Sequence, residues 1–423
     1  MSTEVSTFAS VGEVIDARAV TTVFQPIVRI DQRQAARKPE DKAEVVGMEA
    51  FARGPRHSPW ETPRALFEAA RQVGRQAELD WICRAGAYRA AMDNELPDGV
   101  TLFVNAEPHT FGTPCPPDLA EVILAAQLRL RVVTEIPERA IADDPLAVLA
   151  AGTACRSAGG GVALDDVGSY PGCLAFLTLL HPDVVKVDLA AMKDREHTMS
   201  GVRAYAERSG ATILAEGIET EAHLEIALSL GATLGQGYLF DHPGPLQLVG
   251  NTLTRPRRTV PFVIAPPAGG GSPRTPYESI SSVSPTAELT KRELLDTTRL
   301  LEARAMAAAE PAVLLSCFQV ARHLTPATAR RYERYAQSSA LVMALGTDVP
   351  SRPALDVRGL ALAADDPLRG EWDVVAVGPH FVAALVARDL GDDGPDPDRR
   401  FAYTLTYDRE LVLGAARTLL HWK

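Results

Sequence analysis

Acid and amide side chains stand at the ends of a series of short apolar runs. Carboxylate and amide oxygens, with no Cys or His among them, are typical ligands of hard ions, so the set predicts a Mg²⁺ or Mn²⁺ site rather than zinc. Several carboxylates meeting at one point would repel one another unless protonated or neutralised by a cation. The residues are Glu49, Asn105, Glu135, Asp165 with Asp166, Lys186 with Asp188, Glu216 with Glu219, and Gln236.

Such a set could support phosphoryl chemistry. Two metal ions about 3.5–4 Å apart, bridged by one carboxylate, would activate water and hold a phosphate for in-line displacement. Lys186 is the cationic side chain at these run ends, and it would orient the attacking water or neutralise developing charge.

The elements that must position these residues follow from the hydrophobic pattern. The apolar runs alternate with longer segments of helical pattern, which is typical of parallel strands joined by helices. Seven or eight strands in about 230 residues favour a (β/α) barrel, in which the carboxyl ends of the strands meet at one face. The runs are 45–48, 101–104, 130–134, 161–164, 183–187, 212–215 and 232–235, and residues 23–30 would add a first strand, joined by the charged loop 31–44.

Each residue also has an ordinary structural explanation. A lone acid after a strand is often a helix cap, and a lone lysine in a strand often reaches to water. Asp188 is better explained as a support for Lys186 or the next helix than as a ligand, and Glu107 and Glu138 as caps or surface residues. The recurrence of the pattern favours metal-dependent phosphoryl chemistry, and a barrel that binds another ligand stays open.

Composition and charge exclude several classes of protein. The 423 residues include 43 basic and 54 acidic side chains, a formal charge of −11, which argues against binding to polymeric nucleic acid or an anionic membrane. Five scattered cysteines form no C-x-x-C pair, which argues against a disulfide framework or a zinc site. No apolar run approaches the ~20 residues of a membrane span, and no signal peptide is seen, so we expect a cytoplasmic protein.

A proline- and glycine-rich segment separates two predicted domains. We predict an N-terminal segment over 1–19, the barrel over 20–250, a linker over 251–279 and a smaller α/β domain over 280–423. In the last domain, helices are expected at 287–310, 325–338 and 408–421, and strands at 340–345, 373–377 and 401–406.

Residues ~20–248 resemble the EAL domain, the cyclic-di-GMP phosphodiesterase barrel. The resemblance implies a modified TIM-type (β/α)8 barrel that hydrolyses cyclic-di-GMP to linear pGpG with two Mg²⁺ or Mn²⁺ ions per active site, and a homodimer formed through the barrel. The name motif stands here as Glu49-Ala50-Phe51 with Arg53, followed in family order by LD (79–80), FVNAEP (103–108), TEIPE (134–138), ALDDVG (163–168), VKVD (185–188), AEGIET (215–220) and QGYLF (236–240), and preceded by FQPI (24–27).

The resemblance also implies the metal ligands. By position, four residues match ligands of one ion, and one of the four matches a bridge to the second. These are Glu49, Asn105, Glu135 and the bridging Asp165, while Asp166 belongs to the second ion.

The remaining site residues match catalytic and substrate-binding positions of the family. Lys186 matches the lysine near the attacking water, and Glu216 a second-metal ligand or base. Glu219 matches the glutamate that steadies the loop after the Asp pair, and Gln236 a residue that holds the water or the second ion. Gln25 and Arg53 match substrate contacts, Arg53 to a phosphate.

Residues ~285–423 resemble the DICT domain, a predicted sensory module, in the segments 324–336, 365–381 and 405–412. The resemblance implies regulation by a signal or protein that the sequence does not identify. Trp372, Tyr407 and Asp408 could line a ligand pocket there, although ordinary packing and capping explain them better.

Two functions stay open at this point. The complete ligand set favours an active phosphodiesterase. The loop Val167–Cys173 departs from the family pattern, with Tyr170 and Pro171 in place of its usual residues, and this favours a weakly active or inactive barrel that acts as a cyclic-di-GMP receptor or interaction module.

Overall fold

The computed structural model describes residues 8–31, 43–170, 172–190, 195–246, 259–262, 274–307, 311–393 and 395–422. The chain divides into two compact units, residues 1–169 with 182–267, and residues 268–423 with 170–181. In the described part of the chain, no helix has the length and apolar character needed to cross a membrane.

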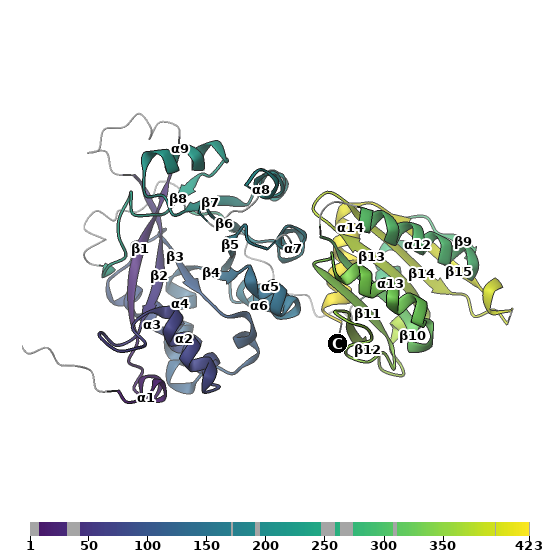
Figure 1. Cartoon of the computed structure of the whole chain (residues 1–423), viewed down its shortest axis with the longest axis horizontal. Coiled ribbons are helices and arrows are strands. Elements are labelled where there is room, and N and C mark those ends of the chain that lie inside the picture. Colours follow the sequence, from purple (N-terminus) through teal and green to yellow (C-terminus); the bar gives the residue numbers. More distant parts are fainter. Residues whose placement is uncertain are drawn as a thin grey trace, which may run out of the picture. The chain divides into compact units, whose positions relative to one another are not determined.

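The first unit is built on a closed barrel of eight strands (Figure 1). Strands β2 to β8 pair in parallel, and β1 is antiparallel to both of its neighbours, β2 and β8. The predicted modified TIM-type barrel is therefore confirmed. Its strands are β1 (Thr21–Arg29), β2 (Val45–Arg53), β3 (Thr101–Asn105), β4 (Arg131–Pro137), β5 (Gly161–Val167), β6 (Val184–Asp188), β7 (Thr212–Glu216) and β8 (Leu234–Gly235).

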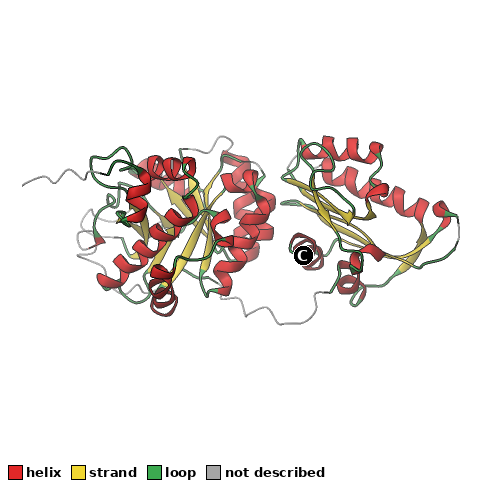
Figure 2. Ribbon diagram, turned by 90° about the horizontal axis from the view of Figure 1, so that it is seen from below, coloured by secondary structure: helices red, strands yellow, loops and turns green. Residues whose placement is uncertain are grey.

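Helices lie outside the barrel strands (Figure 2). Their starts follow ordinary capping rules: Thr62 accepts a hydrogen bond from the Ala65 amide, and Pro63 occupies the first helical position of α2. The helices between residues 11 and 229 are α1 (Val11–Asp16), α2 (Pro63–Gln72), α3 (Gln76–Asp93), α4 (Ala120–Arg129), α5 (Arg139–Asp143), α6 (Pro145–Ser157), α7 (Cys173–Leu180), α8 (Arg195–Ser209) and α9 (Glu221–Ser229). Of these, α7 belongs to the residues 170–181 that group with the second unit.

A layer of apolar side chains fills the barrel interior directly below the candidate site. Side chains two residues apart on a strand share a face, so the residue two positions before a site residue also points inward. A Cβ atom at Gly47 would lie 2.8 Å from the Phe103 ring, which shows how tightly this layer is filled. The layer comprises Ile27, Val46, Phe103, Val133, Ala163, Val184, Leu214 and Leu234.

Residues 259–262, which lie inside the predicted linker, close the amino end of the barrel. Val260 is 1% exposed and belongs to the same apolar layer, with Phe262 packed beside it. Arg131 donates to the Val260 carbonyl at 3.0 Å, and its guanidinium lies 4.4 Å from the centre of the Phe262 ring. The other residues of the predicted linker before Arg274 lie outside the described residues.

The second unit is a mixed seven-stranded sheet in the order β12-β11-β10-β13-β14-β15-β9. Side chains of α12 and α13 share a core cluster with one face of the sheet, and α11 and α14 contact β13 and β14. Its elements are α11 (Pro276–Ser281), β9 (Ala287–Thr290), α12 (Lys291–Ala307), β10 (Val313–Val320), α13 (Pro326–Ala336), β11 (Leu341–Thr347), β12 (Arg358–Ala361), β13 (Glu371–Val377), β14 (Val382–Asp389), β15 (Arg400–Thr406) and α14 (Arg409–Leu420).

The sequence expectations for this unit held for β11, β13, β15, α13 and α14. The helix predicted at 287–310 was wrong at its start. Residues 287–290 form the strand β9, because they pair with β15. The segments that became β10, β12 and β14 were not predicted as strands. Trp372 packs edge-on against Phe401, and Asp408 caps α14, as ordinary packing and capping require.

Candidate metal and phosphate site

The predicted strand-end residues converge at the carboxyl face of the barrel. Glu49, Asn105, Glu135 and Asp165 come from the four neighbouring strands β2 to β5. Strand β1 is antiparallel to the others, so its site residue lies within the strand and not at its carboxyl end. This residue is Gln25, which pairs directly with Glu49 on β2. Gln236 follows β8 immediately, and it is 3% exposed.

Lys186 lies at the centre of this group. Its side chain points into the barrel from β6 and is fully buried. Its Nζ lies 2.6 Å from Glu135 Oε1, 2.9 Å from Asp165 Oδ1, 3.0 Å from Glu216 Oε1 and 3.2 Å from Glu49 Oε2. One ammonium therefore faces four carboxylates.

The amide side chains complete the hydrogen bonding around Glu49. Asn105 Nδ2 donates to Glu49 Oε1 at 3.0 Å, and Gln236 Nε2 donates to Glu49 Oε2 at 2.8 Å. Gln236 Nε2 also lies 3.2 Å from Gln25 Oε1, and Gln25 in turn donates to the Asp241 carbonyl. These bonds fix the Glu49 carboxylate in one orientation.

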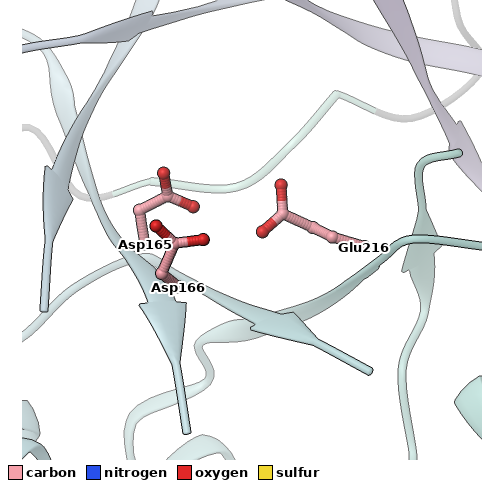
Figure 3. A group of neighbouring side chains, drawn as sticks. All are labelled: Asp165, Asp166 and Glu216. Atoms are coloured by element: carbon pink, nitrogen blue, oxygen red, sulfur yellow. The ribbon is translucent and has the colours of Figure 1, made fainter. Parts of the chain in front are cut away.

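An irregularity in β5 brings two successive carboxylates to the site. Successive residues of a regular strand point to opposite faces, but the pairing of β5 with β6 shifts register between Leu164 and Val167. Asp166 has a positive φ of 57° in this bulge. Asp165 and Asp166 thus face Glu216, with one oxygen of each within 4.8 Å of the others (Figure 3).

The electrostatics reflect an excess of acid. Burial and then the neighbouring carboxylates raise the pKa of Glu135 and of Glu216 well above the ordinary value. Burial and repulsion from Asp165 raise the pKa of Asp166 to about 6. Burial lowers the pKa of Lys186, but the four acids outweigh it and raise that pKa above its usual value.

The donor set fits a divalent cation. Glu135 Oε2 and Gln236 Oε1 are buried with no hydrogen-bond partner among the described residues. Unpartnered buried oxygens are costly, and a bound ion or a water molecule beside it would satisfy them. Since every candidate ligand is a carboxylate or an amide, the site favours Mg²⁺ or Mn²⁺ over zinc.

Two predicted site residues lie away from this group. Arg53 donates to the Ala52 carbonyl at 2.9 Å, and its guanidinium lies 5.8 Å from the centre of the Phe51 ring. Glu219 is exposed, and its carboxylate makes no hydrogen bond or ion pair within the described residues. The loop contact implied for Glu219 is not made by that side chain here.

Glu138 makes the contact with the loop that follows the Asp pair. It is 2% exposed, and its carboxylate accepts hydrogen bonds from the Gly168 amide at 3.0 Å and the Ser169 amide at 2.6 Å. Sequence reasoning assigned Glu138 to a cap or the surface. Its position three residues after Glu135, at the end of β4 and beside β5, was the signal that could have identified it.

A second buried acid supports the loop after β3. Asp80 accepts from the Glu107 amide at 3.0 Å and from the Thr110 hydroxyl at 2.8 Å, and it pairs with Arg84 at 2.8 Å. Because Asn105 is the last residue of β3, directly before this loop, Asp80 steadies the segment next to a candidate ligand.

A pocket of about 1070 Å³ opens above the carboxylates. Its floor includes Glu49, Asn105, Asp165, Asp166 and Glu216, and its walls come from α2, α3, the loop after β3 and the start of α5. The pocket is large enough for a dinucleotide-sized ligand.

Two family descriptions match the chain. Residues 10–243 match the EAL domain, and residues 278–390 match the DICT domain, described as a sensory domain in diguanylate cyclases and two-component systems. The first match covers more than half of the chain, and the second lies within the second unit.

Several curated proteins are similar to the chain. The probable cyclic di-GMP phosphodiesterase PdeB of Escherichia coli is 26% identical over 240 residues, which are 55% of this chain and 44% of PdeB. The cyclic di-GMP phosphodiesterase RocR of Pseudomonas aeruginosa is 29% identical over 164 residues, 36% of this chain and 41% of RocR. The chain thus spans less than half of either relative.

Solved structures also resemble the chain. The PaMucR phosphodiesterase in complex with c-di-GMP is 24% identical and covers 56% of this chain and 97% of that one, with a TM-score of 0.45. BlrP1 of Klebsiella pneumoniae, in a calcium and cyclic-di-GMP complex, is 29% identical and covers 53% of this chain and 56% of that one, with a TM-score of 0.44.

Proposed function

The chain belongs to the EAL domain family, and from that premise we propose that its barrel hydrolyses cyclic-di-GMP to linear pGpG in a metal-dependent reaction. The observation that carries the proposal is the group of four carboxylates around buried Lys186 at the mouth of the barrel. The phosphodiesterases PdeB and RocR support the choice of substrate.

The carboxylates and amides would hold two Mg²⁺ or Mn²⁺ ions. Glu49, Asn105, Glu135 and Asp165 would bind one ion, while Asp166 and Glu216 would bind the second with Asp165 shared between them. When bound, the ions would supply Lewis acidity to the reacting phosphate and lower the pKa of the attacking water.

The side chains of the chain would control the proton and the geometry. Water adds to phosphorus and the P–O3′ bond breaks. One proton of the water passes to a carboxylate, for which Glu216 is placed beside Lys186, and the leaving O3′ takes up a proton from solvent to become the 3′-hydroxyl. Gln236 Oε1, which has no partner among the described residues, would accept a hydrogen bond from that water. Lys186 would stay charged and offset part of the negative charge of the phosphate.

The substrate would lie in the pocket above this group, with Gln25 and Arg53 as contacts. Gln25 is already held by Gln236 and the Asp241 carbonyl, so it is preoriented. Arg53 would have to leave its contact with the Ala52 carbonyl to reach a phosphate. The DICT domain would regulate the barrel in response to a signal or protein partner.

The alternative is a receptor that binds the dinucleotide without turnover, which the altered loop after Asp166 favours. Purified full-length protein with Mn²⁺ should release linear pGpG from cyclic-di-GMP. Tight binding without product at any Mn²⁺ or Mg²⁺ concentration would select the receptor. Absence of both binding and turnover would contradict both functions.

A further inference from the structure

The pocket extends from the carboxylates along one face of α2. Arg64, Phe67, Glu68 and Arg71 all line it. Residues three, four and seven positions apart lie on the same side of a helix, so these side chains form one continuous wall. From Arg64 to Arg71 this wall is about 10 Å long, at 1.5 Å per residue.

The charge of the lining changes along the pocket. Its floor is acidic, and the arginines among the described lining residues are Arg64 and Arg71 on α2 and Arg139 at the start of α5. Arg139 is paired with Glu107, and Arg71 with Glu68. Two of the three guanidiniums are therefore already neutralised by a neighbouring carboxylate.

Arg64 differs from the other two. Its side chain is exposed and makes no hydrogen bond or ion pair within the described residues. Glu68 receives hydrogen bonds from Gln72 and Arg71, and these lower its pKa most. The charge of Arg64 lowers that pKa less, after the charge of Arg71, and Arg64 makes no hydrogen bond to Glu68. Arg64 thus offers the pocket a positive charge that no contacting acid cancels.

A cyclic dinucleotide needs such a charge. It carries two phosphodiesters, and only one can occupy the reacting position above the carboxylates at a time. The other phosphate must lie elsewhere in a pocket whose floor is acidic, where it is repelled unless a cation faces it. Arg53, the contact proposed above for one phosphate, is not among the residues that line the pocket, because its guanidinium is turned to the Ala52 carbonyl and the Phe51 ring. It therefore leaves the other phosphate without a cation.

We propose that Arg64 binds the non-reacting phosphate of the dinucleotide, so that the face of α2 is the wall that positions the substrate. This inference rests on the proposed function for the chemistry of the ligand. Arg64 contacts substrate rather than the reacting atoms, so it sets binding and not the chemical step. A guanidinium suits this task because it donates two parallel hydrogen bonds to one phosphate.

The test compares Arg64→Ala, Arg64→Lys and Arg71→Ala with the control Arg89→Ala, which removes an exposed arginine of α3 outside the pocket. KM and kcat for cyclic-di-GMP are measured with Mn²⁺, and the Kd is measured with Ca²⁺ in its place. Arg64→Ala should raise KM and Kd about tenfold with little change in kcat, as expected for a lost charge-assisted hydrogen bond. Arg64→Lys should restore part of the loss, and Arg71→Ala should have a smaller effect.

The same measurements separate the two levels of the proposal. If KM and Kd of Arg64→Ala stay within twofold of the Arg89→Ala values, Arg64 does not bind the ligand. A fall in kcat at constant KM would also overturn the inference. If the wild-type protein binds cyclic-di-GMP without turnover, the hydrolytic function fails, and Arg64 is judged by Kd alone. A wild-type protein that does not bind the dinucleotide overturns both.

Discussion

Lys186 and its four carboxylate neighbours carry a formal charge of −3 in a buried site. Such an excess is tolerated only with proton uptake or a bound cation. The raised pKa values of Glu135 and Glu216 favour proton uptake when no ion is bound, and a divalent ion would provide the cation. Metal binding at this site should therefore release protons, because the ion displaces them from the carboxylates.

Glu138 is expected to control catalysis through the loop that carries Asp166. Its carboxylate holds the Gly168 and Ser169 amides, so Glu138→Ala frees the loop and misplaces the carboxylate before it. We expect kcat to fall at least tenfold, with a smaller change in KM. The measurement is steady-state hydrolysis of cyclic-di-GMP with Mn²⁺.

The matched variant is Glu219→Ala, because Glu219 is exposed and its carboxylate makes no hydrogen bond or ion pair among the described residues. It should keep kcat within about twofold of the wild-type value. If Glu219→Ala loses activity and Glu138→Ala does not, the loop is held as the family resemblance implied and not as the structure shows.

Asp373 is expected to make the second unit less stable as the pH rises. It is fully buried opposite Cys317, and neither carboxylate oxygen has a hydrogen-bond partner among the described residues. Burial and then Glu371 raise its pKa well above the usual value. An acid with a raised folded-state pKa stabilises the fold below its unfolded-state pKa, and this stability is lost as the pH rises through the folded-state value.

Asp373→Asn should therefore raise the melting temperature of the second unit at pH 8, with a gain that shrinks toward pH 5. The gain at pH 8 should exceed the gain at pH 5 by about 1.4 kcal/mol or more, because each unit between the folded- and unfolded-state pKa values corresponds to that free energy and the amide has no proton to lose. Calorimetry of the full chain between pH 5 and pH 8 measures it, with the exposed Asp365→Asn as control. An equal gain at all pH values would mean that Asp373 does not take up a proton on folding.

At the scale of elements, each of the strands β3 to β7 carries a site residue two positions after an apolar residue of the barrel interior. Phe103 lies two residues before Asn105, Val133 two before Glu135, and similar pairs occur on β5, β6 and β7. The position of each ligand thus depends on how the layer below it is filled. Val260 and Phe262 complete that layer at the amino end of the barrel.

Val260→Ala is expected to destabilise the barrel although it lies in a proline-rich segment. The side chain is 1% exposed, and its truncation leaves a cavity beneath Val133 and Ala163, so the free energy of unfolding should fall by about 2 kcal/mol. Urea unfolding of the full chain measures this, with the exposed Val73→Ala as control. Equal unfolding curves for the two variants would show that residues 259–262 do not support the barrel.

The sequence predicted some of these elements and contacts but not others. The barrel and its strand ends were predictable because apolar runs alternate with helical segments and each run ends in a polar residue. Val260 was missed because proline and glycine around it mask a single buried contact. Glu138 was missed because an acid after a strand is usually a cap, and only the spatial proximity of β4 and β5 shows its partners. The β9 strand depends on pairing with β15, more than 100 residues away, which local pattern does not reveal.

At the scale of the whole molecule, the residues that would bind metal and dinucleotide come from the EAL match, and the DICT match contributes none of them. The formal charge of −11 is therefore not evidence against a phosphate ligand, because part of the acid forms the floor of the pocket. Two divalent ions there would add four positive charges where the phosphate must bind.

The central claim is that the barrel hydrolyses cyclic-di-GMP at the carboxylates around Lys186. The most direct measurement is release of linear pGpG by full-length protein with Mn²⁺, beside Glu49→Gln and the exposed control Glu121→Gln. Glutamine keeps the shape of Glu49 but removes the charge that faces Lys186, so turnover should fall at least 100-fold while the control matches the wild type. Equal turnover in Glu49→Gln, or no product from folded wild-type protein that binds Mn²⁺, would contradict the account.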